Sequence, residues 1–128
     1  MPIPPAGSIL VVEDEALLRM MAVDMFEDAG FAVFSAANGK DAARLLSENA
    51  SIKGLFTDVE MPGPISGLDL ARIAHDLYPH VSILVVSGRI GPSPGDLPPR
   101  AKFVGKPYDA KAILSLFEDQ KGFTIDPH

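Results

Sequence analysis

Five short runs rich in apolar residues are spaced along the chain, and the apolar positions in each run are largely continuous rather than alternating with polar ones. Continuous runs of this length are typical of parallel strands that are buried on both faces of a sheet. We therefore predict five strands, at residues 8–12, 31–35, 54–58, 81–86 and 102–105.

Between these strands, apolar residues recur at the spacing of one helix face. Gly30 is expected to end the first helix, and Asn38 to cap a second helix over residues 39–49. Ser66 with Asp69 resembles a capping box that begins a third helix. The predicted inner faces, in chain order, are Leu18, Met21, Ala22, Met25 and Ala29; Ala42, Leu45 and Leu46; Leu70, Ile73, Ala74 and Leu77; and Ala110, Ile113, Leu114 and Phe117.

The stretch from Gly88 to Pro99 lies where a further helix would complete the alternation, but proline and glycine are frequent in it. Proline removes amide donors and glycine adds backbone entropy, so we predict a loop or one short turn there. A proline-rich tail at residues 1–7 and a second tail at residues 119–128 are expected to flank a single domain over residues 8–118.

The alternation of buried strands and helices predicts an α/β fold with helices on both faces of a parallel sheet. We expect a flavodoxin-like three-layer sandwich, in which the strand order is 2-1-3-4-5. Its fourth helix is predicted to be short or replaced by a loop.

Composition and charge narrow the possible chemistry. The 128 residues include no cysteine, which excludes thiol catalysis, disulfides and thiolate metal sites. A net charge of -6 without a run of Lys or Arg argues against direct DNA binding, so protein partners are expected. No leader-like start and no apolar run long enough to cross a membrane is found, so we expect a cytoplasmic protein.

Polar residues stand where the predicted strands end. Glu13 and Asp14 follow the first strand, Asp58 ends the third, Ser87 follows the fourth, and Lys106 follows the fifth. In a parallel sheet all strand-to-helix turns lie on one edge, which is where ligands bind in open α/β sheets. We therefore expect these five side chains to converge.

The converging residue types suit phosphoryl transfer. Carboxylates that gather at one edge repel one another, and a hard cation with oxygen ligands, such as Mg²⁺, relieves that repulsion. Lys106 could pair with Asp58 or hold a phosphoryl oxygen, and Ser87 offers a hydroxyl donor. An Asp carboxylate can itself be the nucleophile that becomes an acyl phosphate.

Four motifs at these strand ends together resemble a response-regulator receiver domain of two-component signalling. They are Glu13-Asp14, Asp58 with Met61-Pro62, Ser87-Gly88 and Lys106-Pro107, and they occur in this order along the chain. The resemblance covers residues 8–118. It implies a single-domain receiver that takes a phosphoryl group from a sensor histidine kinase or a phosphotransfer protein.

The resemblance also implies a role for each matched residue. Asp58 would be the phosphoacceptor, with Lys106 holding phosphoryl oxygens. Mg²⁺, or Mn²⁺ in its place, would be bound by Asp14, Asp58 and the backbone carbonyl of Glu60, with Glu13 assisting through water.

Further residues are implied in switching and in access to the phosphoryl site. Ser87 would also hold a phosphoryl oxygen and move toward it, while the Phe103 ring turns inward behind it. Glu60 and Arg89 are expected to control the access of water, and Gly88, as a small residue, is expected to leave the phosphoryl site open. Phosphorylation would switch protein–protein interactions, and the only reactions expected are Mg²⁺-dependent self-phosphorylation and autodephosphorylation, so we do not expect an enzyme.

Other functions remain as alternatives. The chain could be a phosphate sink or a receiver fragment of a hybrid histidine kinase. A phosphatase similar to the haloacid-dehalogenase family would need a second Asp where Glu60 stands, and a flavin carrier would need a phosphate loop where the acids 13–15 stand. A pseudo-receiver that is not phosphorylated would be expected to lack the acids or the lysine.

Overall fold

The computed structural model describes residues 7–88 and 97–118, and within them the predicted alternation of strands and helices is confirmed. The boundaries differ from the predicted ones by a few residues at most. The elements are β1 (Ser8–Val12), α1 (Ala16–Asp28), β2 (Ala32–Ala36), α2 (Gly39–Glu48), β3 (Ile52–Asp58), α3 (Gly67–Leu77), β4 (Ser82–Ser87), β5 (Lys102–Gly105) and α4 (Ala110–Glu118).

All neighbouring strands of the sheet pair in parallel, in the order β2-β1-β3-β4-β5. This is the predicted flavodoxin-like arrangement. Chain order reverses between β1 and β3, where Val12 lies beside Thr57. In doubly wound sheets the crevice beyond the strand ends at such a reversal is the usual place for a ligand. Asp58, the last residue of β3, lies at that crevice and pairs with Val86 of β4.

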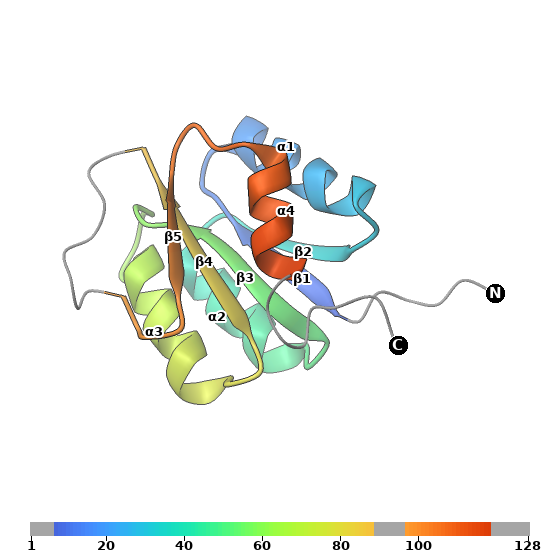
Figure 1. The fold of residues 1–128 in the computed structure, drawn as a ribbon. Helices are drawn as coiled ribbons and strands as arrows, with labels where there is room; N and C mark the ends of the chain where they lie inside the picture. Colours follow the sequence, from blue (N-terminus) through green and yellow to red (C-terminus); the bar gives the residue numbers. More distant parts are fainter. Residues whose placement is uncertain (1–6, 89–96, 119–128) are drawn as a thin grey trace.

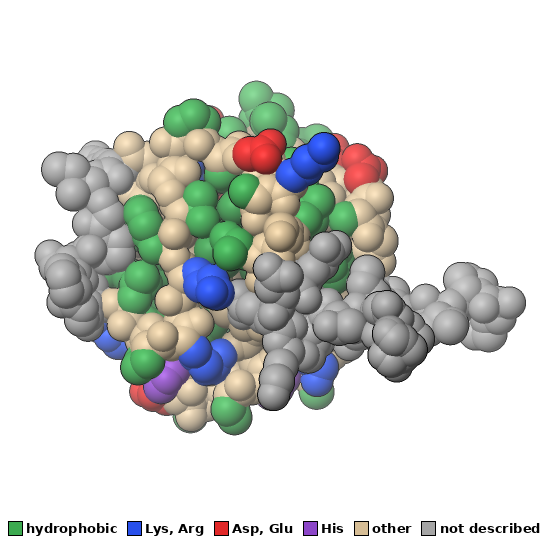
Figure 2. All heavy atoms as spheres, viewed as in Figure 1, with side chains coloured by type: hydrophobic (Ala, Val, Ile, Leu, Met, Phe, Trp, Pro, Cys, Tyr) green, Lys and Arg blue, Asp and Glu red, His purple; other side chains and the backbone are tan. Residues whose placement is uncertain are grey.

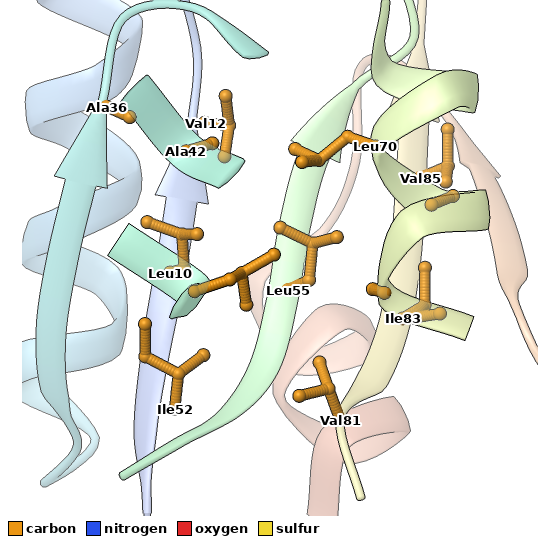
Figure 3. Packing of buried hydrophobic residues seen from close by; sticks show 13 residues of the cluster. Leu10, Val12, Ala36, Ala42, Ile52, Leu55, Leu70, Val81, Ile83 and Val85 are labelled. Carbon is orange, nitrogen blue, oxygen red and sulfur yellow. The ribbon is translucent and has the colours of Figure 1, made fainter. Parts of the chain in front are cut away.

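Helices cover both faces of the sheet, as predicted, with α2 and α3 on one face and α1 and α4 on the other (Figure 1). Figure 3 shows the first of the two cores, in which Leu10, Leu55 and Ile83 project from the three central strands toward α2 and α3. All three side chains are fully buried. This aliphatic layer holds the central strands in a fixed register, which in turn places the residues at their carboxyl ends.

The second core is aromatic and is centred on Phe26 of α1. Its ring meets those of Phe31, Phe56 and Phe117 edge to face, with centroids 5.3–6.2 Å apart. Edge-to-face pairs place the positive ring edge against the negative face, which adds about 0.5–1.5 kcal/mol per pair beyond the area buried. Phe26 thus joins α1 directly to α4 through Phe117 and to the sheet through Phe56.

Three of the four predicted helix faces were partly wrong, and the larger errors are in α1 and α3. Met21 of α1 is 58% exposed and Leu77 of α3 is 65% exposed, although both were expected inside. Phe26 and Ala71, which the predicted faces omitted, are buried instead. The first half of α1 is rich in leucine and methionine, so more than one of its faces is apolar. The face that contains Phe26 is the one buried, because Phe26 packs in the aromatic core.

Ala110, the first residue of α4, is also exposed rather than buried. The remaining members of the four predicted faces are buried or half-buried, as expected. A residue in the first turn of a helix can lie on the inward-facing stripe and still be exposed, because the end of the helix extends beyond the part that packs on the sheet.

The predicted helix ends are confirmed. The Asn38 side chain accepts a hydrogen bond from the amide of Asp41 at 2.8 Å, and Ser66 forms a reciprocal capping box with Asp69. Gly30 has a φ of +98° just after α1, a backbone conformation that glycine adopts without steric cost. These caps fix where each helix starts or stops and so define the lengths of the intervening turns.

The segment that leads into β5 is fastened to the end of α3. The guanidinium of Arg100 donates to the carbonyl of Val81, to that of Ala74 at 3.2 Å and to that of Tyr78 at 3.1 Å. Burial lowers the pKa of Arg100. Arg100 was not among the residues predicted from the sequence. Arg100 satisfies carbonyls at the carboxyl end of α3 and thereby sets the position at which β5 begins.

The expected loop from Gly88 to Pro99 is described only in part, because residues 89–96 lie outside the described residues, as do 1–6 and 119–128. The described positions of that stretch are not helical. Figure 2 shows apolar side chains at the surface over β5, between α3 and α4. Within the described residues, no helix has the length and apolar character needed to cross a membrane.

Candidate functional site

The residues predicted to converge lie at the carboxyl edge of the sheet, each where its strand ends. Glu13 and Asp14 follow β1, and Asp58 ends β3. Ser87 ends β4 beside Gly105 of β5, and the backbone amide of Lys106 donates to the Ser87 carbonyl at 2.8 Å. The parallel register therefore brings together residues that are up to 93 positions apart in sequence.

A lysine joins two of the carboxylates. Lys106 Nζ donates to Oδ2 of Asp58 at 2.7 Å and to Oε1 of Glu13 at 3.2 Å. The side chains of Lys106, Asp58 and Glu13 are 24%, 13% and 10% exposed, respectively. Water therefore screens these pairs less than it screens a surface salt bridge. The predicted pairing of Lys106 with Asp58 is thus present, and Glu13 is a second direct partner.

The charges in this trio shift the pKa of the lysine upward. Burial by itself lowers the pKa of Lys106, but the hydrogen bonds and charges of Asp58 and Glu13 together outweigh it and raise that pKa above its ordinary value. Lys106 is therefore a permanent cation at neutral pH. Its positive charge can therefore interact with the negative oxygens of a group bound at or beside Asp58.

Glu13, rather than Asp14, turns into the site. Its carboxylate lies beside Lys106, and its second oxygen accepts a hydrogen bond from the amide of Glu15 at 3.1 Å. Burial raises the pKa of Glu13, partly offset by the Glu15 amide and by Lys106. Asp14 is exposed and faces solvent at the rim. A role for Glu13 through water remains a prediction, whereas its direct contact with Lys106 is seen.

Asp58 is held from several sides. Its Oδ1 accepts the amide of Glu60 at 3.2 Å, and its backbone carbonyl accepts the hydroxyl of Thr57 at 3.0 Å. The first residue of α3, Gly67, lies so close that an added Cβ would be 1.8 Å from the Asp58 carbonyl oxygen. The turn after β3 therefore requires glycine at position 67, and the carboxylate of Asp58 has a defined direction.

The residues predicted for switching lie on neighbouring strands. Ser87 is almost fully buried, and Phe103 is half-buried against the core beneath α2 and α3. Gly88 is exposed, and a Cβ there would come no closer than 4.0 Å to the Lys106 side chain, so this flank of the site is open. Glu60 is also exposed. Arg89 lies outside the described residues, and its role stays a prediction.

The donor atoms at this edge suit a hard divalent cation. Within the described residues, no three or more His, Cys, Asp or Glu side chains are grouped as a metal site. Mg²⁺, however, uses only one or two protein carboxylates and keeps several waters. Asp14, Asp58 and the backbone carbonyl of Glu60 supply oxygens of the right kind, so the residues present fit the predicted ion in number and chemistry.

The structure adds a groove that the sequence analysis missed. It has a volume of ≈ 430 Å³, borders the charged trio, and is lined by Glu13, Leu18, Met21, Lys106, Pro107 and Tyr108. The peptide bond between Lys106 and Pro107 is cis. Tyr108 packs edge to face on Phe56 with centroids 5.5 Å apart, and burial raises its pKa.

Exposed apolar side chains continue from this groove along α1. Leu17, Met20 and Met21 are 58–65% exposed. In Figure 2 apolar side chains protrude at the top of the view, where the chain after β5 passes α1. The signal in the sequence was the excess of leucine and methionine in α1 over what one buried stripe needs. We call Leu17, Met20, Met21 and the groove the α1 surface.

Comparisons with known proteins agree on one family. Residues 9–93 match the family described as the response regulator receiver domain. The chain is 33% identical over 115 residues to the response regulator receiver protein CpdR of Brucella abortus, covering 86% of this chain and 92% of that protein. It is 29% identical over 118 residues to the sensor kinase CckA of the same organism, covering 89% of this chain but only 12% of CckA.

A solved structure shows the same fold. The response regulator receiver protein from Sinorhizobium medicae superimposes with a TM-score of 0.78 at 29% sequence identity. The match covers 86% of this chain and 90% of that one.

Proposed function

Because the chain belongs to the response-regulator receiver family, we propose that it accepts a phosphoryl group on Asp58 from a histidine kinase or a phosphotransfer protein and thereby switches its protein contacts. The observation that carries this proposal is the 2.7 Å contact between Lys106 Nζ and Asp58 Oδ2 at the reversal point of the sheet. It places a cation beside the one carboxylate that ends a central strand.

In the proposed reaction Asp58 acts as the nucleophile. A carboxylate oxygen attacks the phosphorus of a phosphohistidine, and a new O–P bond forms as the N–P bond of the donor breaks. The electron pair of that bond returns to the donor imidazole, which takes up a proton. Lys106 stays charged throughout the transfer, because its pKa is raised. Its positive charge can therefore neutralise the oxygens of the phosphoryl group without a prior proton transfer.

Asp14, Asp58 and the carbonyl of Glu60 would hold the metal ion. Bound Mg²⁺ would neutralise charge on the phosphoryl oxygens, which is the main requirement of phosphoryl transfer. The protein's own part is to fix the acceptor. The amide of Glu60 holds one Asp58 oxygen at 3.2 Å, and the Gly67 backbone lies close against the Asp58 carbonyl.

The switch would follow from the new charge on Asp58. A phosphoryl group beside Lys106 offers acceptor oxygens that the Ser87 hydroxyl can reach by moving, and Phe103 on the adjacent strand would repack behind it. Ser87 lies beside Gly105 in the register of β4 and β5, and Phe103 lies beside Val85. Two packings that differ by a few charge-assisted hydrogen bonds are enough for a two-state switch.

We assign docking of the protein phosphodonor to the α1 surface. A donor histidine must reach Asp58, and the groove of ≈ 430 Å³ borders Lys106, the partner of Asp58. Leu17, Met20 and Met21 expose large apolar side chains there, and solvent-exposed apolar patches of this kind mark protein contacts. Gly88 would leave the phosphoryl site open, and the side chains of Glu60 and Arg89 would control water access and the autodephosphorylation rate.

A receiver segment of a hybrid kinase is the second candidate. The observation that favours it is the match to CckA, of which this chain spans 12%. A phosphate sink would share the same chemistry. A hybrid-kinase segment would pass the phosphoryl group on to a phosphotransfer partner, whereas a phosphate sink would lose it to water, so transfer from the labelled protein to such a partner separates these two candidates.

The first experiment measures intact mass after incubation with Mg²⁺ and acetyl phosphate, for the native chain and for Asp58→Asn. We expect the gain of one phosphoryl group in the native chain, dependent on Mg²⁺ and absent in the variant. A protein that gains no mass with either acetyl phosphate or a phosphorylated protein donor would be a pseudo-receiver. Mass gain in Asp58→Asn would place the acceptor elsewhere.

A further inference from the structure

The polar atoms of Glu13 make hydrogen bonds with four other residues, Ala36, Glu15, Arg19 and Lys106. Its amide donates to the Ala36 carbonyl at the end of β2 at 3.1 Å, and its carboxylate binds Lys106 and the amide of Glu15. Its carbonyl oxygen accepts a hydrogen bond from the guanidinium of Arg19 on α1 at 2.8 Å. The acidic turn between β1 and α1 is therefore braced through one residue.

The start of α1 lacks the usual side-chain cap. Its N-cap, Glu15, makes no side-chain hydrogen bond to the helix, and no acidic residue lies in the first turn. Glu13 supplies the missing acceptor for the Glu15 amide from outside the helix. Arg19 lies one turn further along, and its own amide donates to the Glu15 carbonyl at 2.9 Å. Glu13, Glu15 and Arg19 therefore form one local network.

We infer that Arg19 is a positioning residue for the acidic turn, holding Glu13 so that its carboxylate stays on Lys106 and Asp14 stays at the rim where a divalent cation would bind. The consequence for cation binding rests on the proposed function. The bracing itself does not, because it is a property of the metal-free protein. A guanidinium has a planar set of donors, and a charged donor makes a stronger hydrogen bond to a carbonyl than a neutral one does.

A simpler role for Arg19 makes the opposite prediction. If its positive charge only offset the acids 13–15, that charge would repel a divalent cation, and removing it would strengthen cation binding. If Arg19 positions the turn, removing it weakens binding because the ligands lose their fixed geometry. Partners that orient metal ligands typically change metal affinity by about 10- to 100-fold. The sign of the change therefore distinguishes the two roles.

The test is a set of amide NMR spectra recorded without and with increasing Mg²⁺, for the native chain, Arg19→Gln and Arg19→Lys. Gln keeps a neutral donor and removes the charge, whereas Lys keeps the charge and loses the planar donor set. Arg44→Ala is the matched control, because Arg44 lies on α2 with its side chain 58% exposed in a surface pair with Glu48. Urea unfolding of each variant shows whether the fold is retained.

Without metal, we expect the Glu15 amide of Arg19→Gln to exchange with solvent at least about tenfold faster than in the native chain, because the braced turn opens more often. Arg44→Ala should leave that rate unchanged. An unchanged Glu15 amide in Arg19→Gln overturns the inference, whatever the metal does.

With Mg²⁺, we expect about tenfold weaker binding in Arg19→Gln and an intermediate loss in Arg19→Lys. Tighter binding in Arg19→Gln, with Arg19→Lys equal to the native chain, assigns Arg19 to charge balance and overturns the inference. A native chain that neither binds Mg²⁺ nor gains a phosphoryl group contradicts the proposed function, while faster exchange of the Glu15 amide would still support the bracing role of Arg19.

Discussion

The Nζ of Lys106 lies 2.7 Å from Oδ2 of Asp58, and the two residues come from the turn after β5 and the end of β3. The strand between them, β4, separates their backbones, so the contact spans the sheet edge from one side of β4 to the other. Glu13 reaches the same nitrogen from β1. The Lys106 ammonium thus links the turn after β5 to the ends of β1 and β3, and it contacts the predicted acceptor Asp58.

Replacing Lys106 by Met should abolish most phosphorylation while keeping the fold. We expect the rate with acetyl phosphate to fall by about 10²-fold, the usual effect of removing one electrostatic stabiliser. Two partly buried carboxylates also lose a partner, which should lower the free energy of unfolding by about 1–3 kcal/mol. Intact mass against time gives the rate, and urea unfolding gives the stability.

Lys102→Met is the matched control for this change. Lys102 is exposed at the start of the edge strand β5, and Lys106 directly follows the end of that strand. We expect near-native phosphorylation and stability within about 0.5 kcal/mol. Equal rates for Lys106→Met and Lys102→Met would remove Lys106 from the phosphoryl site.

The stability contributed by Lys106 should depend on alkaline pH. The carboxylates of Asp58 and Glu13 outweigh the effect of burial and raise the pKa of Lys106 above its ordinary value of 10.5. The folded state then holds this proton more tightly than the unfolded state. Its contribution is fully present below pH 10.5 and is lost as the pH rises through the higher native pKa.

The measurement is the difference in free energy of unfolding between the native chain and Lys106→Met, from about pH 8 to about pH 11.5. Subtraction removes the titration of the other lysines and of the tyrosines that both proteins share. We expect the difference to shrink at the alkaline end. A difference that stays constant across this range would contradict a raised pKa for Lys106.

Met21→Asp should impair transfer from a protein donor without affecting transfer from acetyl phosphate. Met21 is 58% exposed and lines the groove beside Lys106, so a charge there disturbs docking but not the acceptor. We expect about a tenfold slower transfer from the phosphorylated partner, equivalent to about 1.4 kcal/mol. Radiolabel transfer from a phosphorylated kinase or phosphotransfer protein measures it.

Leu77→Asp provides the comparison for this surface. Leu77 is 65% exposed but lies at the carboxyl end of α3, away from the strand ends that carry the site. It should leave both donors unaffected. Equal slowing by Met21→Asp and Leu77→Asp, or slowing with acetyl phosphate as well, would show that the α1 surface is not where the donor docks.

Gly67→Ala should be strongly unfavourable. Its Cβ would lie 1.8 Å from the Asp58 carbonyl oxygen, and because that atom belongs to the backbone, β3 and α3 must move apart. We expect a loss of about 1–3 kcal/mol or more in the free energy of unfolding, together with slower phosphorylation because Asp58 moves.

Gly88→Ala is the paired control for stability, since a Cβ there would come no closer than 4.0 Å to Lys106. It should change the free energy of unfolding by no more than about 0.5 kcal/mol. Similar losses for Gly67→Ala and Gly88→Ala in urea unfolding would show that the close approach at Gly67 does not constrain the turn.

The sequence by itself determined the strands, the helix caps and the set of residues at the sheet edge. Short continuous apolar runs that alternate with helical patterns are typical of parallel strands buried on both faces of a sheet, and the polar residues that end such strands lie at its carboxyl edge. Asn38, Ser66 and Gly30 cap their helices through contacts within a few residues, so local sequence was sufficient to predict them.

Only the tertiary structure decided which face of α1 is buried and which acid enters the site. The α1 sequence permits several apolar stripes, and Phe26 was selected because its ring fits between Phe31, Phe56 and Phe117 from three other parts of the chain. That choice left Met21 exposed beside Lys106. Glu13 turns inward because Lys106, 93 residues away, provides its counter-charge, and contacts over such separations carry no local signal in the sequence.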